Sequence, residues 1–421
     1  MSKMKQLVAF FCVGFVLIGC NQKDEKSGNR DLGESSAASV GLDDNHLAYI
    51  DSVMNLYHND GRISGSVVLV ARNGKTVKLD AYGQKNDSEQ MQTDNLFRIA
   101  SMTKAIVAVA AMSLLEEGKF NMDDPLWWYI PEFREMEILD KVNMADSTYT
   151  SYPATNEIKI KHLFNHTSGL GYGFQDDKLN ALFFKHGISE GFEHRDILLK
   201  DNTAKLASLP LMHEPGEKWT YGVSYDVLGH LIEIWSGQTL DVFLHERIFG
   251  PLEMNDTHFY LPEEKEDRLV KVYMSSQEGY KETDYELIHY PVKGAKKYLS
   301  GGGDLSCTAS DYAKFAQMVM DKGMFNGQRI VGPKTIEWMT AQQSNGGLEG
   351  IGWGFGVQET KNEMLSHTTP GSNSWGGFFS THCLMDPSEE LIVIVFMQMY
   401  PNWEWHLSQK VQNIVYSSID R

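Results

Sequence analysis

The feature that most limits how this 421-residue chain can fold is one helical segment that is apolar on almost every side. The segment covers residues 105–115, and Glu116-Glu117-Gly118 ends it. A helix whose apolar side chains surround most of its axis has no face for water and is therefore buried. The chain must place other layers of structure around this helix, which requires a large domain or two closely joined ones.

Ser101 and Lys104 stand at the start of this helical segment. Their spacing of three places both side chains on one face of a helix, within reach of each other. A serine hydroxyl is a poor nucleophile unless a proton acceptor lies beside it. A lysine fills that role when burial or nearby positive charge favours its neutral form, and the apolar neighbours of Lys104 indicate burial. The same spacing at Ser2 and Lys5 shows that chance also produces it, so the remaining sequence has to support the pair.

Strand patterns at both ends of the chain surround a middle that is richer in helical patterns. Residues 392–396 are all apolar, which predicts a central strand of a sheet that is covered on both faces. The other expected strands are residues 65–70, 76–82, 378–385 and 391–399, and the other expected helices are 46–57, 226–235 and 404–419. This order predicts an α+β fold whose cleft lies between the sheet and the helices.

The N-terminus reads as a secretory signal. Lys3 and Lys5 precede an apolar run over residues 7–18, which is too short to span a membrane comfortably. Residues 17–20 (Leu-Ile-Gly-Cys) resemble the bacterial lipobox, which implies cleavage before Cys20 and acylation of that cysteine. Polar residues follow up to position 44, as in a flexible tether. We therefore expect a signal peptide at 1–19, a tether at 20–44, a folded domain at 45–420, and an envelope lipoprotein, in the outer membrane.

The charge of the chain limits its partners. With 38 basic and 56 acidic residues, the formal net charge is −18, which repels nucleic acid and anionic lipid. Attachment to a membrane would therefore come from acyl chains, and the expected partner is a small-molecule ester or amide substrate bound by a monomer. Cys307 and Cys383 could form one disulfide, but the sequence gives no reason to expect it.

Two further segments carry groups that a serine-based reaction needs. A Pro215-Gly216 turn delivers Tyr221 just before a helix, where a phenol near a lysine could relay a proton; a packed anchor is the alternative. Residues 371–378 predict an edge strand whose paired glycines allow a close approach of the backbone to a ligand. The backbone N–H groups of Ser101 and Phe378 are the candidate oxyanion donors.

Two patterns that suggest other chemistry are better explained by structure. His162 and His166 are four residues apart but lack the adjacent glutamate of a zinc protease, so we expect them to cap and pack a helix end. Gly301-Gly302-Gly303 lacks a phosphate-binding context and predicts a backbone turn near the cleft. We expect neither a metal nor a cofactor.

Taken together in this order, the motifs resemble those of the class C β-lactamase-like serine hydrolases, which include penicillin-binding carboxypeptidases, D-aminopeptidases and family VIII esterases. The resemblance covers about residues 45–420. Besides Ser101-x-x-Lys104, it is carried by Gly118-Lys119-Phe120, Asp123-Asp124-Pro125, residues 129–133 and 160–170, Pro251-Leu252-Glu253-Met254, residues 301–306 and residues 311–315.

The resemblance implies a β-lactamase/transpeptidase-like fold with an antiparallel sheet flanked by helices. It places an α/β part at 45–122 and 291–420 and a mostly helical part at 123–290. It also implies that Ser101 is the nucleophile, Lys104 its base and Tyr221 the proton relay.

Two departures from the lactamase pattern favour carboxylic esters as substrates. Val223 stands where the family's Tyr-x-Asn motif has an amide, and Trp375-Gly376-Gly377 stands where Lys-Thr-Gly is usual. Without that lysine, the site lacks a cation for a penicillin carboxylate. These four residues are the expected substrate contacts. Hydrolysis of β-lactams or of D-amino-acid amides, and a non-catalytic penicillin- or peptidoglycan-binding role, remain alternatives.

Overall fold

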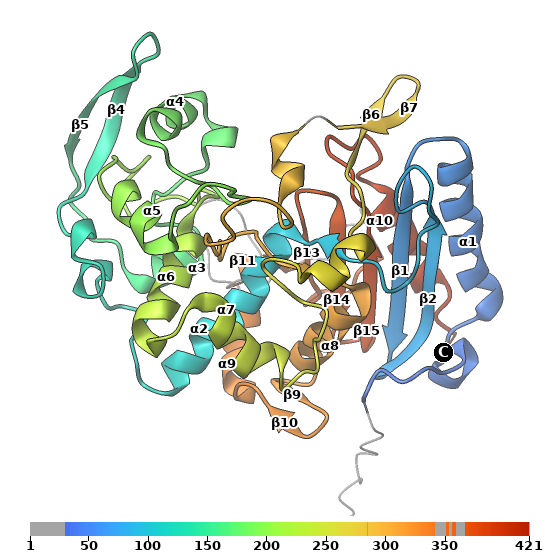
Figure 1. The fold of residues 1–421 in the computed structure, drawn as a ribbon. Coiled ribbons are helices and arrows are strands. Elements are labelled where there is room, and N and C mark those ends of the chain that lie inside the picture. The colour runs from blue at the N-terminus through green and yellow to red at the C-terminus, as the bar shows by residue number, and fades with distance from the viewer. Residues whose placement is uncertain (1–29, 284, 342–350, 353–355, 359–366, 421) are drawn as a thin grey trace, which may run out of the picture.

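The computed structural model describes residues 30–283, 285–341, 351–352, 356–358 and 367–420. Within these residues, seven strands form one antiparallel sheet in the order β11-β12-β13-β14-β15-β1-β2 (Figure 1). These strands are β1 (Gly65–Arg72), β2 (Lys75–Gly83), β11 (Ile351–Gly352), β12 (Gly356–Gln358), β13 (Asn373–Gly376), β14 (Thr381–Asp386) and β15 (Leu391–Phe396). The expected antiparallel sheet with a central 392–396 segment is confirmed.

The remaining elements complete the layers around this sheet. The helices are α1 (Asp44–Asn59), α2 (Thr103–Glu116), α3 (Ile160–Phe164), α4 (Asp177–His186), α5 (Leu199–Leu206), α6 (Ser224–Ser236), α7 (Leu240–Leu244), α8 (Ala309–Met320), α9 (Pro333–Thr340) and α10 (Leu407–Ser417). The short strand pairs are β3 (Phe97–Arg98) with β8 (Ser306–Cys307), β4 (Glu137–Asn143) with β5 (Thr148–Pro153), β6 (Tyr273–Ser276) with β7 (Gly279–Glu282), and β9 (Met324–Phe325) with β10 (Gln328–Arg329).

Alternate residues of the central strands enter two different hydrophobic cores. Val67 of β1 lies opposite Phe396 of β15, and both pack in the core that contains α2 and α8. Val68 and its partner Val395 face the second core, which α1 and α10 cover. The period of two along a strand thus explains why this run is apolar throughout: each side chain meets a covered face.

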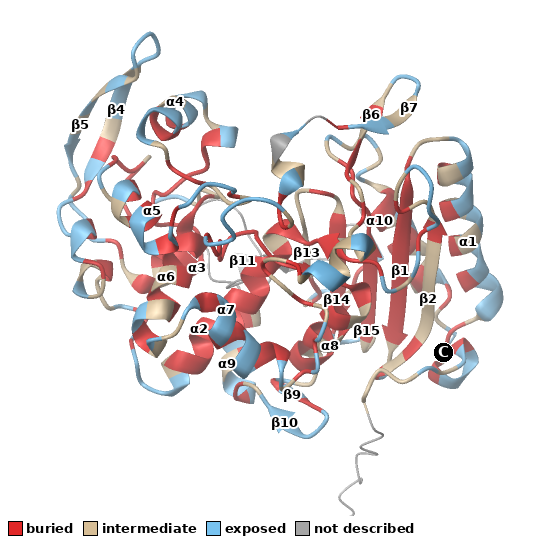
Figure 2. Ribbon diagram, in the orientation of Figure 1, coloured by how far each residue is buried: buried red, intermediate tan, exposed pale blue. Residues whose placement is uncertain are grey.

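Helix α2 is buried as its sequence predicts. Every residue from 103 to 114 is buried, and α2 packs against α6 of the mostly helical part (Figure 2). The helical part lies beside the sheet, and its β4–β5 hairpin projects away from the rest of the molecule (Figure 1). No helix in the described part of the chain combines the length and apolarity needed to cross a membrane.

Two expectations about boundaries need correction. The flexible tether does not extend to residue 44, because the 3-10 turn at Ala37–Val40 and Leu42 bury apolar side chains against α1 and α10. Residues 377–380 form a turn, with Ser380 at a φ of 72°, and not the start of a strand. The middle segment also contains the β4–β5 and β6–β7 hairpins beside its helices. Expectations for residues 1–29 fall outside the described residues.

Candidate active site

The chain turns sharply into the helix that begins at Ser101. Strand β3 leads to Ala100, whose φ of 45° is left-handed, and a 3-10 turn (Ala100–Met102) then continues into α2. Such a conformation costs a residue with a side chain about 1–3 kcal/mol, so the surroundings must hold it in place. The N–H of Ile99 donates to the carbonyl oxygen of Leu305 at 2.9 Å, and Thr103 Oγ1 accepts the Leu305 N–H at 3.1 Å. These contacts fix both sides of the turn.

The structure brings Ser101, Lys104 and Tyr221 together, as the sequence predicts. Lys104 Nζ lies 3.2 Å from Ser101 Oγ, and the Tyr221 hydroxyl lies 2.6 Å from the same atom. Lys104 comes from the first turn of α2, whereas Tyr221 comes from the loop that precedes α6. Both distances permit proton exchange with the serine hydroxyl.

Lys104 is held in one position by a full set of acceptors. Its side chain is 2% exposed, and Nζ donates to Ser101 Oγ, to the Tyr172 hydroxyl at 3.1 Å and to the Gly302 carbonyl at 2.6 Å. The ring of Tyr221 lies 4.7 Å from Nζ and adds a cation–π contact. These three polar partners fix Nζ beside the serine hydroxyl.

Tyr172 and Gly302 are site residues that the sequence reasoning missed. A side chain at Gly302 would place a Cβ 2.9 Å from the Tyr172 hydroxyl and 2.8 Å from a carboxylate oxygen of Asp226. Only glycine therefore allows this carbonyl to approach Lys104. The glycine run was expected to form a turn near the cleft, but its contact with the lysine has no local sequence signal. Tyr172 has none either.

The predicted oxyanion donor Phe378 lies across from the nucleophile turn. Its backbone N–H donates to no acceptor among the described residues, which leaves it available for a ligand. Gly377 brings this segment close to the turn, because a Cβ at this position would lie 2.3 Å from the Ile99 carbonyl oxygen. Ser101 supplies a second N–H from the first helical turn, where such groups lack helical partners.

The other predicted substrate contacts lie in different places. The ring of Trp375 is 5.7 Å from that of Tyr221. Gly376 and Gly377 line a second hollow of about 410 Å³, which Phe378 also lines. Val223 is 1% exposed and packs in the apolar core at the start of α6, so it does not line the pocket described below. The structure thus groups Trp375 with the reacting residues but not Val223.

Buried titratable groups surround Lys104. Burial raises the pKa of Asp226, while a hydrogen bond from Ser300 and the charge of Lys104 oppose that rise. Burial lowers the pKa of His166 far below its usual value, and Lys104 lowers it further. The imidazole of His166 is therefore neutral and packs 4.9 Å from the Tyr221 ring, which positions the phenol.

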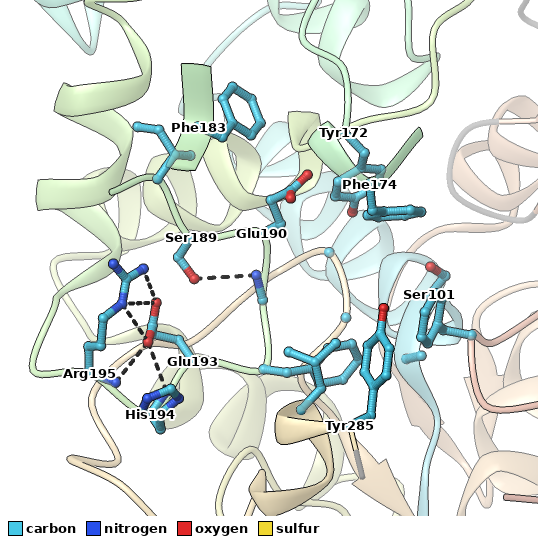
Figure 3. Close-up of a pocket in the computed structure, with 18 of the residues that line it drawn as sticks. Ser101, Tyr172, Phe174, Phe183, Ser189, Glu190, Glu193, His194, Arg195 and Tyr285 are labelled. Atoms are coloured by element: carbon cyan, nitrogen blue, oxygen red, sulfur yellow. Dashed lines mark hydrogen bonds and ion pairs between the residues drawn. The ribbon is translucent and has the colours of Figure 1, made fainter. Parts of the chain in front are cut away.

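A pocket of about 540 Å³ opens from Ser101 (Figure 3). Aromatic side chains dominate the end near the serine, and four ionisable side chains lie along the segment after α4. The lining includes Phe174, Phe192, Tyr285 and Phe378, and the ionisable residues Glu190, Glu193, His194 and Arg195. Most of its lining residues lie between positions 172 and 195, and the others are Ala100, Ser101, Tyr285, Leu287, Gly302, Gly303 and Phe378.

The expected roles of the two histidines agree with their surroundings. His162 Nδ1 accepts the Lys159 N–H at 3.1 Å at the start of α3, and the ring of His166 packs against the ring of Tyr221. Among the residues that the structure describes, no group of three or more His, Cys, Asp or Glu side chains could hold a metal ion. Cys307 and Cys383 are buried and are not joined by a disulfide.

Ser101 stands at the start of a helix beside an antiparallel sheet and is hydrogen-bonded to a lysine and a tyrosine. This arrangement defines a serine hydrolase of the β-lactamase/transpeptidase-like fold. The chain belongs to the beta-lactamase family, whose model matches residues 47–406.

Several known proteins are similar to it over most of their length. Protein Rv1367c of Mycobacterium tuberculosis (strain ATCC 25618 / H37Rv) is 31% identical over 361 residues, which is 81% of this chain and 87% of that protein. Esterase EstB of Burkholderia gladioli is 30% identical over 393 residues, 88% of this chain and 95% of that protein. A solved structure described as "EstCE1, a hydrolase with promiscuous acyltransferase activity" aligns with a TM-score of 0.75 and 25% identity, covering 89% of this chain and 99% of that one.

Proposed function

We propose that this protein hydrolyses carboxylic esters through an acyl-enzyme formed on Ser101. The observation that carries the proposal is the convergence of Lys104 Nζ and the Tyr221 hydroxyl on Ser101 Oγ, at 3.2 and 2.6 Å. A hydroxyl that is hydrogen-bonded to a buried lysine and a half-buried tyrosine has two partners for proton exchange and is an activated nucleophile.

The reaction proceeds in two steps. Ser101 Oγ attacks the ester carbonyl carbon while its proton passes to the Lys104–Tyr221 pair. The N–H groups of Ser101 and Phe378 bind the oxyanion, and Tyr221 returns the proton to the departing alkoxide. A water molecule then attacks the acyl-enzyme, and the same groups release the carboxylic acid and restore the serine.

The surroundings of the serine favour esters over β-lactams. Trp375, rather than a lysine, stands beside Tyr221, so this position offers an aromatic wall and no cation for a lactam carboxylate. The names of EstB and EstCE1, as an esterase and a hydrolase, support the same preference. β-Lactam or D-amino-acid amide hydrolysis and a purely binding role become outcomes of the test.

The test compares the wild type with Ser101→Ala on 4-nitrophenyl esters and penicillins, with intact-mass detection of the acyl-enzyme. We expect ester turnover and a covalent adduct only in the wild type. Faster turnover of penicillins than of esters would replace the ester proposal with a lactamase. A wild type that forms no adduct would support the binding role, and turnover by Ser101→Ala would refute the nucleophile.

The proposal for the cellular location rests on the sequence alone. Cleavage before Cys20 and its acylation would place the enzyme in the cell envelope as an outer-membrane lipoprotein, acting there as a monomer on small substrates. Labelling with a fatty-acid probe in a bacterial host tests this. The label should be lost in Cys20→Ser, and an equally labelled variant would refute it.

A further inference from the structure

We propose that Glu190 makes the enzyme selective for esters that carry an ammonium group away from the reacting carbonyl. This inference rests on the proposed function and adds a substrate class to it. Glu190 lies in the wall of the pocket that opens from Ser101, between Ser189 and Tyr172 (Figure 3).

The pocket is large enough for a bulky substituent and mostly offers aromatic surface. Its volume of about 540 Å³ falls within the usual range for small-molecule sites. Phe174 and Phe378 meet edge to face with ring centroids 5.8 Å apart, beside Ser101. Aromatic rings offer apolar contact and only a modest cation–π attraction, so strong selectivity for a cation requires an anionic side chain among the lining residues.

Two acids line this pocket, and one of them is already neutralised. Arg195 donates to both carboxylate oxygens of Glu193, and the Glu193 side chain is 5% exposed. This fork makes the pair electrically neutral and leaves Glu193 little capacity for a substrate cation.

Glu190 has no such partner. Its carboxylate accepts the backbone N–H of Gly173, and no described lysine, arginine or histidine forms an ion pair with it. Burial raises the pKa of Glu190 to about 7, and the backbone N–H groups of Gly173 and Phe174 oppose that rise. A carboxylate that is partly desolvated and has no cation gains most when a ligand brings one.

The experiment uses matched pairs of 4-nitrophenyl esters: acyl chains of four to eight carbons that end in either an ammonium or a methyl group. A second pair carries the same groups on the alcohol side. The assay is run at pH 8, above the raised pKa of Glu190 of about 7, so that the carboxylate form is favoured. The wild type should prefer the ammonium member of at least one pair, and Glu190→Gln should lower kcat/KM for it about tenfold while changing the methyl member less than twofold.

Glu190→Gln keeps an oxygen that can accept the Gly173 N–H, so it separates charge recognition from support of the loop. Asp196→Asn is the charge-matched control, because Asp196 is 69% exposed, pairs with Lys297 and does not line the pocket. This control should leave every ratio unchanged.

Other outcomes reject the inference. An equal loss on both members of each pair would show that Glu190 only positions the loop, and unchanged ratios would show that it contacts no substrate. A wild type that cleaves none of these esters and forms no adduct with a fluorophosphonate would instead overturn the proposed function.

Discussion

Replacing Gly377 by alanine tests whether the backbone beside the nucleophile forms an oxyanion site. A Cβ at this position would lie 2.3 Å from both the Ile99 carbonyl oxygen and Thr381 Oγ1. Real Cβ contacts are rarely shorter than 3.0 Å, so the segment has to move by at least about 0.7 Å. Because Phe378 is the next residue, its N–H moves with the displaced backbone.

The magnitude follows from the geometry of the donor. Loss of one oxyanion donor lowers kcat by about 10²–10³-fold, and a misplacement of about 1 Å can cost about 10²-fold. We therefore expect Gly377→Ala to lower kcat on a 4-nitrophenyl ester by roughly 10²-fold. Its KM should change much less, because the displaced group acts mainly in the transition state.

Gly376→Ala is the matched control, because its Cβ would lie 3.1 Å from the Thr381 carbonyl oxygen and needs little movement. Far-UV circular dichroism and thermal unfolding would confirm that both variants fold. If folded Gly377→Ala keeps a kcat within threefold of Gly376→Ala, the backbone at Phe378 does not form the oxyanion site.

Two other perturbations test the site and its support. Tyr221→Phe should lower kcat at least 100-fold, because it removes the hydroxyl that contacts Ser101. Tyr172→Phe should lower kcat about tenfold or less, because Lys104 keeps its contacts with Ser101 and Gly302. Equal losses in the two variants would argue against Tyr221 as the proton relay. Burial, with Lys161 and Lys159, lowers the pKa of His162 to about 4, below its unfolded value near 6.5. Between these two values the unfolded chain binds a proton that the folded chain does not, so the free energy of unfolding falls by on the order of 3 kcal/mol as the pH drops from about 6.5 to about 4. Urea unfolding of His162→Gln should show a smaller loss over this range, and an unchanged slope would contradict the reasoning.

The sequence predicts the parts of the fold that depend on local periodicity. The helical segment 105–115 is apolar on nearly every side and the run 392–396 is apolar throughout, so each is stable only when covered on all sides, and the structure confirms both predictions. The 31–43 segment shows the limit. Its few apolar residues are typical of a tether, but Ala37, Val40 and Leu42 are buried in the core that α1 and α10 cover, a contact with distant parts of the chain.

The sequence predicts the site residues that belong to a recognisable motif, but not those that contact the site from distant parts of the chain. Ser101 and Lys104 lie three residues apart in one helical segment, so their spacing in the sequence directly predicts that their side chains are close. The Tyr172 hydroxyl contacts Lys104 across 68 residues of sequence, and the Glu190 carboxylate accepts the Gly173 N–H from the loop after α4. Neither contact follows from a helical or strand periodicity, or from a motif spacing, so the sequence alone does not predict it.

Because helix α2 is buried, the reacting groups at its start keep their positions only while the core of the domain is folded. The 3-10 turn that leads into this helix carries the hydroxyl and the first turn of the helix carries the amine, while the rest of the helix packs against α6 in the main hydrophobic core. The reacting pair thus cannot separate through the fraying that exposed loops undergo. Heat inactivation should accordingly coincide with cooperative melting of the whole domain, so that residual activity reports how much of the population is still folded.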